Sequence, residues 1–433
     1  MSLRRRLQER ARTLGPIRVG LVGAGQMGTG LVCQMERMDG MRIVATADVV
    51  SGRAASAYGE SGVPVSHVVS MDDDVERAAE LIQEGKRIAT AHADWLVRIP
   101  ALDVIVECTG VPEVGAQVCL AAIEAGKSIV NMNVEADATV GYRLAQLALD
   151  KNVVYTLIGG DEPGAIKQLY DFADVLGFEI VAIGKGKNNP LDRTANPETV
   201  RAQAIEQMMS PKMLASFVDG TKTMVEMTAV GNATGFAPEV PGGYGPQCTV
   251  DDLPRVFVPR SAGGILCAPG AVDYAIGPAP GVFVVITTDQ PKIIRDLDYL
   301  HLRGHGRHWV LYRPYHLANL EAPITIADAV LDRKVTLATY RPPVCETVAC
   351  AKRDLRPGDK IDALGGYTVY GLIERAQTSS AEGMVPVGLI VGATVERPVK
   401  ANEPIRFPDV ALDETQSIVR LRREQDRALL TVS

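Results

Sequence analysis

Three glycines near the start of the chain have the spacing that most clearly indicates chemistry. Gly23, Gly25 and Gly28 follow an apolar run and read G-x-G-x-x-G. This spacing allows a tight turn, a close approach of the backbone to a pyrophosphate, and close packing of a helix whose first N–H groups face the phosphates. The motif therefore predicts a nicotinamide dinucleotide site.

A carboxylate follows at the distance that a ribose contact requires. The apolar run Met41 to Ala47 predicts a second strand, and Asp48 ends it about 20 residues beyond the glycines, where a carboxylate can accept both ribose hydroxyls. Arg53 follows closely and could meet a 2′-phosphate, so we favour NADPH, with NADH left open. The predicted cofactor contacts are Gly23, Gly25, Gln26, Met27, Gly28, Asp48, Arg53, Thr109 and Gly110.

A segment rich in lysine and asparagine is the next candidate. It runs from Gly184 to Pro190 and is predicted to form a turn after a strand from Glu179 to Ile183. Lys185, Lys187 and Asn188 would form an anion cradle, because ammonium and amide groups hold phosphates and oxyanions. A lysine there could also relay a proton if burial lowers its pKa. The alternative is an ordinary solvated loop.

Carboxylates on other segments form a further group of candidates. Asp161 and Glu162 precede a predicted helix, and Lys222 and Glu226 lie on a stretch with helical spacing, Lys212 to Gly235. Because Mg²⁺ and Mn²⁺ prefer oxygen ligands, the three acidic residues are candidate ligands of a divalent cation that would polarise a substrate. Lys222 would add an oxyanion donor. For each carboxylate the alternative is a helix cap or a surface charge.

Composition excludes several classes of protein. With 433 residues the chain should hold two or three domains. A net charge of −7 argues against nucleic acid or anionic membranes as partners. The seven cysteines include no C-x-x-C pair, which predicts reduced thiols in a cytoplasmic protein without disulfides or structural zinc. The arginine-rich start leads into no apolar signal region, and no apolar run is long enough to span a membrane.

The order of strands and helices predicts an α/β chain in three parts. Residues 1–158 should form a Rossmann-type doubly wound sheet, 159–340 an α+β catalytic and dimerisation domain, and 341–433 a small β-rich module appended to it. Residues 236–282, rich in glycine and proline, are expected to form long loops. The terminal module carries no cluster of acid–base groups, so we expect it to support a homodimer, to form a lid or to be structural.

Taken in order, these segments resemble a known group of enzymes. After the glycine motif come Gly-Asp-Glu-Pro-Gly at 160–164, Gly-Lys-Gly-Lys-Asn-Asn at 184–189, Asp-Gly-Thr-Lys-Thr at 219–223 and Tyr-Arg-Pro-Tyr-His at 312–316. The chain resembles homoserine-dehydrogenase-like oxidoreductases with a SAF-type C-terminal domain, and most of all the deoxyxylulose-phosphate-reductoisomerase-like enzymes. The resemblance implies NADPH-dependent conversion of 1-deoxy-D-xylulose 5-phosphate to 2-C-methyl-D-erythritol 4-phosphate, an isoprenoid precursor, and thus a small phosphorylated substrate.

Two other hypotheses remain open. Residues 219–223 also resemble the Asn-Gly-Thr-Thr-Asn segment of homoserine dehydrogenases. The Asp-x-x-x-Lys catalytic pattern that follows this segment in homoserine dehydrogenases is not found in this chain. Reduction of another small aldehyde, ketose or sugar acid is therefore the second hypothesis. The third is a non-catalytic dinucleotide-binding sensor, which would leave the polar segments without a function.

Overall fold

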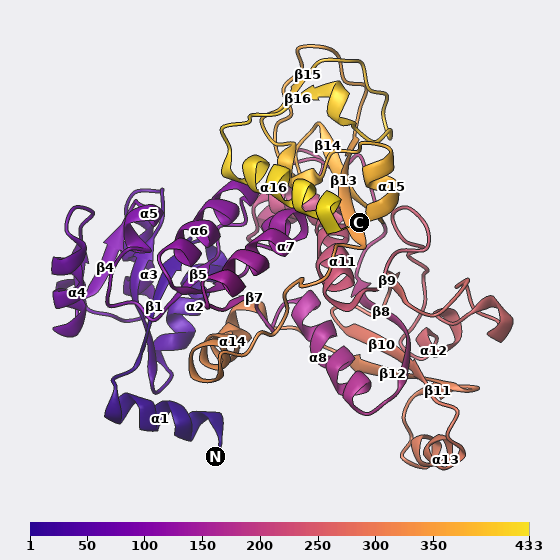
Figure 1. Cartoon of the computed structure of the whole chain (residues 1–433), viewed down its shortest axis with the longest axis horizontal. Coiled ribbons are helices and arrows are strands. Elements are labelled where there is room, and N and C mark those ends of the chain that lie inside the picture. Colours follow the sequence, from indigo (N-terminus) through magenta and orange to yellow (C-terminus); the bar gives the residue numbers. More distant parts are fainter. Residues whose placement is uncertain (433) are drawn as a thin grey trace. The chain divides into compact units, whose positions relative to one another are not determined.

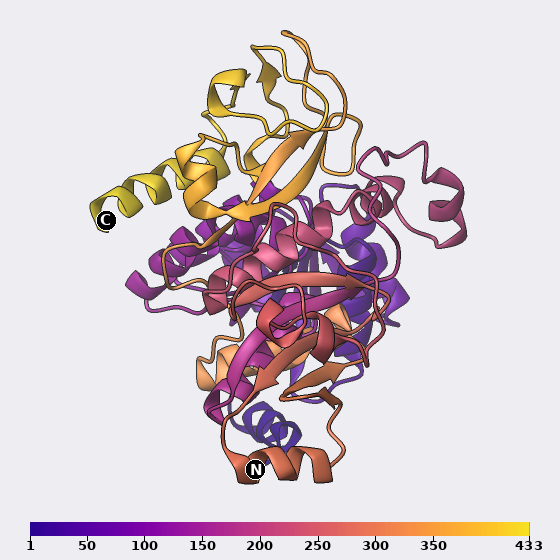
Figure 2. The ribbon, with the colours of Figure 1, turned by 90° about the vertical axis from the view of Figure 1, so that its right-hand side faces the viewer.

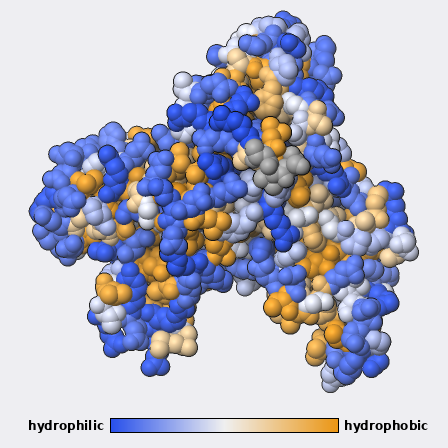
Figure 3. Space-filling view, in the orientation of Figure 1, coloured by the Kyte–Doolittle hydropathy of each residue, from blue (hydrophilic) through white to orange (hydrophobic). Residues whose placement is uncertain are grey.

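The computed structural model describes residues 1–432 and divides the chain into two compact units. The first unit comprises Met1–Asp161 and Leu317–Tyr340, and the second comprises Glu162–His316 and Arg341–Ser433. Figure 1 labels their helices and strands. On the face seen in Figure 3, small apolar groups are interspersed among hydrophilic residues. Among the described residues, no helix combines the length and the apolar character that crossing a membrane requires.

A seven-stranded parallel sheet forms the first unit, with strands in the order β3-β4-β2-β1-β5-β6-β7. Its strands are β1 (Ile17–Val22), β2 (Met41–Ala47), β3 (Val68–Ser70), β4 (Arg87–Thr90), β5 (Val104–Glu107), β6 (Ser128–Asn131) and β7 (Tyr155–Leu157). Its helices are α1 (Leu3–Thr13), α2 (Gln26–Glu36), α3 (Arg53–Glu60), α4 (Val75–Gln83), α5 (Ala93–Leu96), α6 (Pro112–Glu124), α7 (Val134–Asp150) and α14 (Ala318–Asp332). The strand order reverses at β1, whose neighbours are β2 and β5, so the predicted Rossmann-type fold is confirmed.

Helix α14 belongs to the first unit although it is distant in sequence. Its residues Ala322 and Ile326 are buried in one core with Leu21 of β1 and Leu31 of α2. The backbone N–H of Leu157 donates to the carbonyl oxygen of Leu337 at 2.8 Å. Figure 1 shows α14 in orange among the indigo and purple elements. The segment Leu317–Tyr340 therefore completes the first unit.

A mixed five-stranded sheet, in the order β11-β12-β10-β8-β9, forms the centre of the second unit. Its strands are β8 (Glu179–Lys187), β9 (Ala271–Ile276), β10 (Val282–Thr287), β11 (Gly304–His305) and β12 (His308–Arg313). The accompanying helices are α8 (Glu162–Val175), α9 (Arg201–Glu206), α10 (Pro211–Val218), α11 (Thr221–Thr234), α12 (Leu253–Val256) and α13 (Pro291–Tyr299). Strand β8 pairs with β9 in parallel and with β10 in antiparallel orientation, so it is held on both sides.

Strand β8 is longer than the sequence predicts. We expected a turn from Gly184, but the strand continues through Lys187. A Cβ placed on Gly184 would lie 2.2 Å from the carbonyl oxygen of Asp273, and one on Gly186 would lie 2.2 Å from that of Pro278, so this face admits only glycine. Because side chains alternate along a strand, Lys185 and Lys187 share the opposite face. The predicted turn is wrong because strand pairing overrides the turn-like composition.

Two further predictions about the second unit are corrected. The stretch Lys212 to Gly235 forms two helices, α10 and α11, which Asp219 and Gly220 separate; Gly220 has a φ of +90°. Residues 236–282 contain the short helix α12 and strand β9 as well as loops, because all six residues from Ala271 to Ile276 pair with β8 through the backbone.

The C-terminal residues pack within the second unit. They form β13 (Cys345–Ala351), β14 (Val369–Arg375), α15 (Ala376–Ala381), β15 (Thr394–Val395), β16 (Val410–Ala411) and α16 (Ser417–Val432). Figures 1 and 2 both show the antiparallel pair β13 and β14 against α11. The backbone N–H of Gly371 donates to Thr221 Oγ1 at 2.8 Å, and the hydroxyls of Thr228 and Thr347 lie 2.7 Å apart. The C-terminal module thus supports the helix that carries Lys222 and Glu226.

Candidate functional site

The glycine motif forms the turn that a dinucleotide site requires. Gly23 has a φ of +98°, and a Cβ on Gly28 would lie 2.0 Å from the carbonyl oxygen of Gly23. No heavy atom lies within 4 Å of the Cβ position of Gly25, which leaves room for a ligand. Helix α2 begins at Gln26, followed by Met27, so its N-terminal N–H groups provide donors for a pyrophosphate.

Asp48 connects the glycine turn to the end of β2. Its Oδ2 accepts a hydrogen bond from the N–H of Ala24 at 2.9 Å, and its Oδ1 accepts one from Val50 at 2.8 Å. The guanidinium of Arg53 lies 3.7 Å from Oδ1, and its side chain is 48% exposed. Each carboxylate oxygen has a further lone pair for a ribose hydroxyl. The two residues are therefore placed as predicted, at the carboxyl edge of the sheet.

A buried carboxylate that we did not predict holds the turn after β5. The N–H of Thr109 donates to Glu107 Oε1 at 2.9 Å, and the hydroxyl of Thr109 donates to the same oxygen. Burial raises the pKa of Glu107 to about 7, although these hydrogen bonds oppose the rise. Gly110 follows with a φ of +67°. The predicted contacts Thr109 and Gly110 are thus kept in place by Glu107.

Lys185 is the centre of a buried charge cluster in the second unit. Its Nζ lies 2.5 Å from Glu162 Oε1 and also donates to Glu226 Oε2. The side chains of Lys185, Glu162 and Glu226 are 7%, 9% and 1% exposed. Burial alone would lower the pKa of Lys185, but attraction by the two carboxylates raises it above its usual value. Lys185 therefore remains an ammonium.

The three predicted metal ligands come together, but a lysine shares two of them. Asp161, Glu162 and Glu226 each offer one carboxylate oxygen, and these oxygens lie within 4.8 Å of one another. Lys185 Nζ contacts Glu162 and Glu226, so it competes with a cation for these two carboxylates. The family models add no support for a cation, and the Mg²⁺ or Mn²⁺ site stays a prediction.

Lys187 lies on the same face of β8 as Lys185 but differs from it in pKa. Its Nζ donates to the carbonyl oxygen of Phe217 at 2.8 Å and to Asn189 Oδ1 at 2.5 Å. Burial and repulsion by Lys185 lower the pKa of Lys187 to about 8. A group with such a pKa can donate or accept a proton near neutral pH. Asn188, which we predicted as an amide donor to an anion, is exposed, and the amide that contacts Lys187 is that of Asn189.

Two partly exposed basic side chains flank the buried cluster. Lys222 Nζ lies 4.0 Å from Glu226 Oε1, one helical turn along α11. His316, which we did not predict, places Nε2 3.5 Å from Glu162 Oε1 and Nδ1 2.8 Å from the carbonyl oxygen of Pro280. Because that carbonyl can only accept, Nδ1 carries a hydrogen. The side chains of Lys222 and His316 are 18% and 25% exposed, so the cluster can be reached from solvent.

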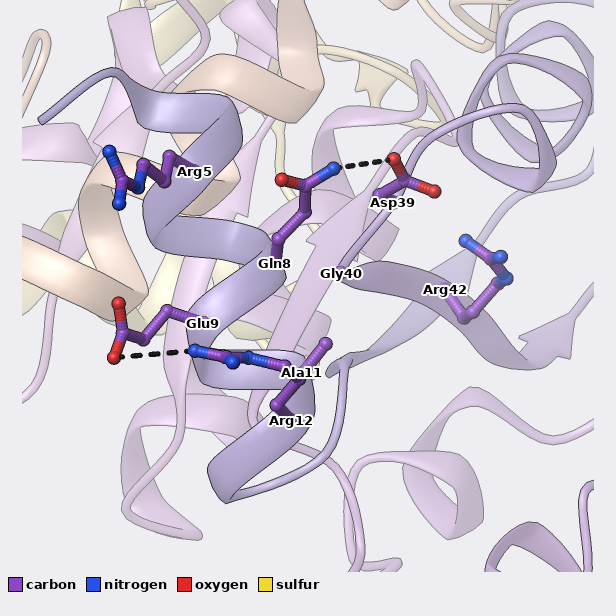
Figure 4. A pocket seen from close by; sticks show the side chains of 8 residues that line it. All are labelled: Arg5, Gln8, Glu9, Ala11, Arg12, Asp39, Gly40 and Arg42. Atoms are coloured by element: carbon purple, nitrogen blue, oxygen red, sulfur yellow. Dashed lines mark hydrogen bonds and ion pairs between the residues drawn. The ribbon is translucent and has the colours of Figure 1, made fainter.

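A hollow beside α1 holds none of these residues. It is lined by Arg5, Gln8, Glu9, Ala11, Arg12, Asp39, Gly40 and Arg42 (Figure 4). Gln8 donates to Asp39, and Arg12 pairs with Glu9. Arg42 donates to the carbonyl oxygen of Met41 and pairs with Glu36, which is not among the lining residues. None of the predicted site residues lines the hollow, so we assign it no role.

Three segments of the chain match known family models. Residues 23–157 match the NAD-binding domain of homoserine dehydrogenase, residues 160–322 the catalytic domain of oxidoreductase DRL, and residues 346–411 the SAF domain. The chain is an NAD-binding oxidoreductase. The predicted homoserine-dehydrogenase-like nucleotide domain and SAF domain are confirmed. Glu162, Lys185, Lys187, Lys222 and Glu226 of this oxidoreductase all lie in the segment that matches a catalytic domain.

Solved structures show a remote likeness to the oxidoreductase. A probable dehydrogenase from Thermotoga maritima is 13% identical over 73% of this chain and 90% of that chain, with a TM-score of 0.41. Scyllo-inositol dehydrogenase from Lactobacillus casei, with NAD(H) and scyllo-inositol, is 13% identical over 74% of this chain and 90% of that chain, with a TM-score of 0.40. No curated protein sequence matches the chain. The function therefore has to be inferred from the family models and the residues.

Proposed function

We propose that this oxidoreductase uses NADPH to convert a small phosphorylated hydroxyketone, with 1-deoxy-D-xylulose 5-phosphate as the first candidate substrate. The observation that supports the proposal is the pairing of two unlike lysines on one face of β8. Lys185 is held as a cation between two carboxylates, whereas Lys187 has a pKa of about 8. One lysine is thus suited to electrostatic stabilisation and the other to proton transfer.

The chain's own residues supply the polar part of the reaction. The hydroxyketone first rearranges to an aldehyde without a change in overall oxidation state, and the aldehyde is then reduced to an alcohol. When bound, NADPH supplies the hydride for that reduction. An ammonium has three N–H donors, and Lys185 gives two of them to Glu162 and Glu226, so the third can stabilise the developing oxyanion. Lys187 gives its proton to the same oxygen and regains one from solvent.

Three lysines are available to an anionic substrate. Lys185, Lys187 and Lys222 lie with the acidic residues Glu162 and Glu226, and Asp161 offers a carboxylate oxygen within 4.8 Å of theirs. The ammonium groups can bind a phosphate. They can also bind the single carboxylate of a sugar acid, because residues 184–187 are paired in a strand and offer no cradle of free N–H groups that would select a phosphate. Oxidation or reduction of a sugar acid is therefore our second candidate.

A turnover assay with a lysine variant tests the proposal. Phosphorylated ketoses, small aldehydes and sugar acids are each mixed with NADPH or NADH, and absorbance at the nicotinamide band is followed. For reduction, Lys187 must start protonated, so kcat/KM should fall as the pH rises through about 8. Lys187→Met should lower kcat/KM on the order of 10²- to 10⁴-fold and remove this pH dependence.

Lys292→Met is the matched control, because Lys292 is 68% exposed and pairs with Asp296 on α13. It should leave the rates unchanged. Wild-type kinetics in Lys187→Met would refute the proposed role. Tight NADPH binding without turnover of any compound in the panel would instead support the sensor.

The expected homodimer is also part of the proposal. Sedimentation of the full chain tests it directly, since a dimer and a monomer of 46.3 kDa are easily separated.

A further inference from the structure

Lys352, directly after β13, is a buried cation of the C-terminal module. Its Nζ lies 2.8 Å from Asp219 Oδ2 and donates to the carbonyl oxygens of Gly366 and Ala195 at 2.8 and 2.5 Å. The side chains of Lys352 and Asp219 are 3% and 0% exposed. The three N–H groups of the ammonium therefore have three acceptors within the protein.

Two of those acceptors lie on the segments next to Lys187. Asp219 follows α10, whose residue Phe217 accepts the hydrogen bond from Lys187, and it precedes α11. Ala195 lies on the segment that continues from Asn189, the other partner of Lys187. Lys352 therefore ties together both segments that supply acceptors to Lys187.

The ion pair is also connected to the start of α11. Asp219 Oδ1 accepts from the N–H of Thr221 at 2.8 Å, which fixes the first turn of the helix that carries Lys222 and Glu226. A fully buried ion pair often costs as much in desolvation as it gains in attraction, so stability alone does not account for this one. The geometric effect of the ion pair is to fix the position of the turn at Asp219 and Gly220, between α10 and α11.

We propose that Lys352 is a positioning residue of the active site, which holds the two segments around Lys187 and brings the C-terminal module into the control of proton transfer. The inference rests on the proposed function, in which Lys187 moves the proton. It assigns to the module a part in the chemistry that neither its composition nor its family description indicates.

Removal of the Lys352 charge should change the electrostatics at Lys187. The charged groups that act on Lys187 are Lys185 on the same strand, Asp219 in the turn and Glu226 on α11. Lys352 neutralises Asp219 in the native protein. Burial raises the pKa of Asp219 and Lys352 opposes that rise, so without Lys352 the pKa of Asp219 should move further up. Where Asp219 is ionised, its uncompensated carboxylate would attract the Lys187 ammonium more strongly, and water could enter between the two segments. Both effects favour the protonated form, so the pKa of Lys187 should rise above about 8.

The test compares Lys352→Met with Arg422→Met in the full-length protein. Arg422 Nη1 lies 2.6 Å from the buried Glu346, in the same module but in a different ion pair, so it is a matched control for the loss of a buried charge. The pKa of Lys187 is read from NMR of protein labelled with [6-¹³C]lysine, with the signal assigned through Lys187→Arg. This readout needs no turnover.

Lys352→Met should raise the pKa of Lys187, move the pH dependence of kcat/KM in the same direction, and lower kcat about 10- to 100-fold, as expected for a misplacement of about 1 Å. Affinity for NADPH should not change. Arg422→Met should leave the pKa of Lys187 at its native value. A common shift in both variants, or no shift in either, would show a merely structural role.

A second variant covers the case in which Lys352→Met does not fold. Lys352→Met combined with Asp219→Asn removes both charges, so the pKa of Lys187 should not rise above the native value. If the pKa of Lys187 in the double variant rises as much as the loss of the Lys352 charge alone should raise it, the electrostatic link is refuted. Failure of the proposed function is recognised separately, by wild-type turnover in Lys187→Met.

Discussion

Replacement of Lys185 with methionine should destabilise the second unit strongly. Methionine keeps an unbranched apolar stem but removes the ammonium that contacts Glu162 and Glu226. Breaking a buried ion pair costs about 3–5 kcal/mol because a charge is left uncompensated. Two carboxylates are left here, so we expect the upper end of this range. At about 2–4 °C per kcal/mol for a unit of this size, the unfolding temperature should fall by roughly 10–20 °C.

The loss should depend on pH in a defined direction. Burial and Glu162 raise the pKa of Glu226, and Lys185 is the first of the groups that oppose the rise. Without Lys185, the pKa of Glu226 in the folded state should move further above its value in the unfolded chain. A raised folded-state pKa gives stability that is present at low pH and lost as the pH rises through that pKa. The variant should therefore be closest to the native protein in acid.

Calorimetry at about pH 5.5 and pH 8 measures both effects. Lys167→Met is the control, because Lys167 pairs with Asp171 along α8 outside the cluster, and such pairs contribute about 0–1 kcal/mol. Adding Glu226→Gln to Lys185→Met should recover part of the loss at pH 8. An equal loss at both pH values, or a loss no larger than that of the control, would refute this account of the cluster.

Three other predictions concern the cofactor, the strand and the metal. Arg53→Ala should raise the KM for NADPH about 10-fold or more, since a charge-assisted hydrogen bond is worth about 1.5–3 kcal/mol. It should leave the KM for NADH unchanged, and equal effects on the two KM values would contradict the NADPH assignment. Gly186→Ala should lower the free energy of unfolding by about 1–3 kcal/mol or more, because its Cβ would lie 2.2 Å from the Pro278 carbonyl oxygen. The control Gly59→Ala has open space around its Cβ and should leave the free energy of unfolding unchanged in the same denaturation experiment. Dialysis against EDTA should leave turnover unchanged, and activity restored by Mg²⁺ or Mn²⁺ would show that a cation displaces Lys185.

The glycine turn could be predicted from sequence because its geometry is local. Gly23, Gly25 and Gly28 lie within one strand–turn–helix unit, and the conformation of each depends on few neighbours. The position of Asp48 could be predicted for the same reason, because it directly follows the adjacent strand, and its contact with a ribose stays a prediction.

The charge cluster could be predicted in part only. Lys185, Lys187, Glu162 and Glu226 were recognised by type, but the extended conformation of residues 184–187 comes from pairing with β9 and β10. Without that strand period, Lys185, Lys187 and Asn188 were assigned to one anion-binding turn, and the contact between Lys187 and Asn189 was missed.

Long-range contacts account for what was missed. His316 reaches Glu162, and Lys352 reaches Asp219, from segments far along the chain. The Tyr-Arg-Pro-Tyr-His segment included His316 in the family resemblance but gave it no site role. No local pattern marks Lys352, since a lysine at the end of a strand is compatible with an exposed surface. Such residues become visible only when the tertiary contacts are known.

The return of α14 to the first unit affects the order in which a newly made chain can fold. The ribosome releases residues 1–161 early, yet the core of this unit also needs Ala322 and Ile326. Until those residues emerge, apolar side chains of α2 such as Leu31 lack part of their cover, while residues 162–316 are being synthesised in between. Exposed apolar surface on a long nascent chain invites aggregation, and domains with continuous sequences avoid this interval. The nucleotide unit, although encoded first, can be completed only after all five strands of the second unit's sheet have been made.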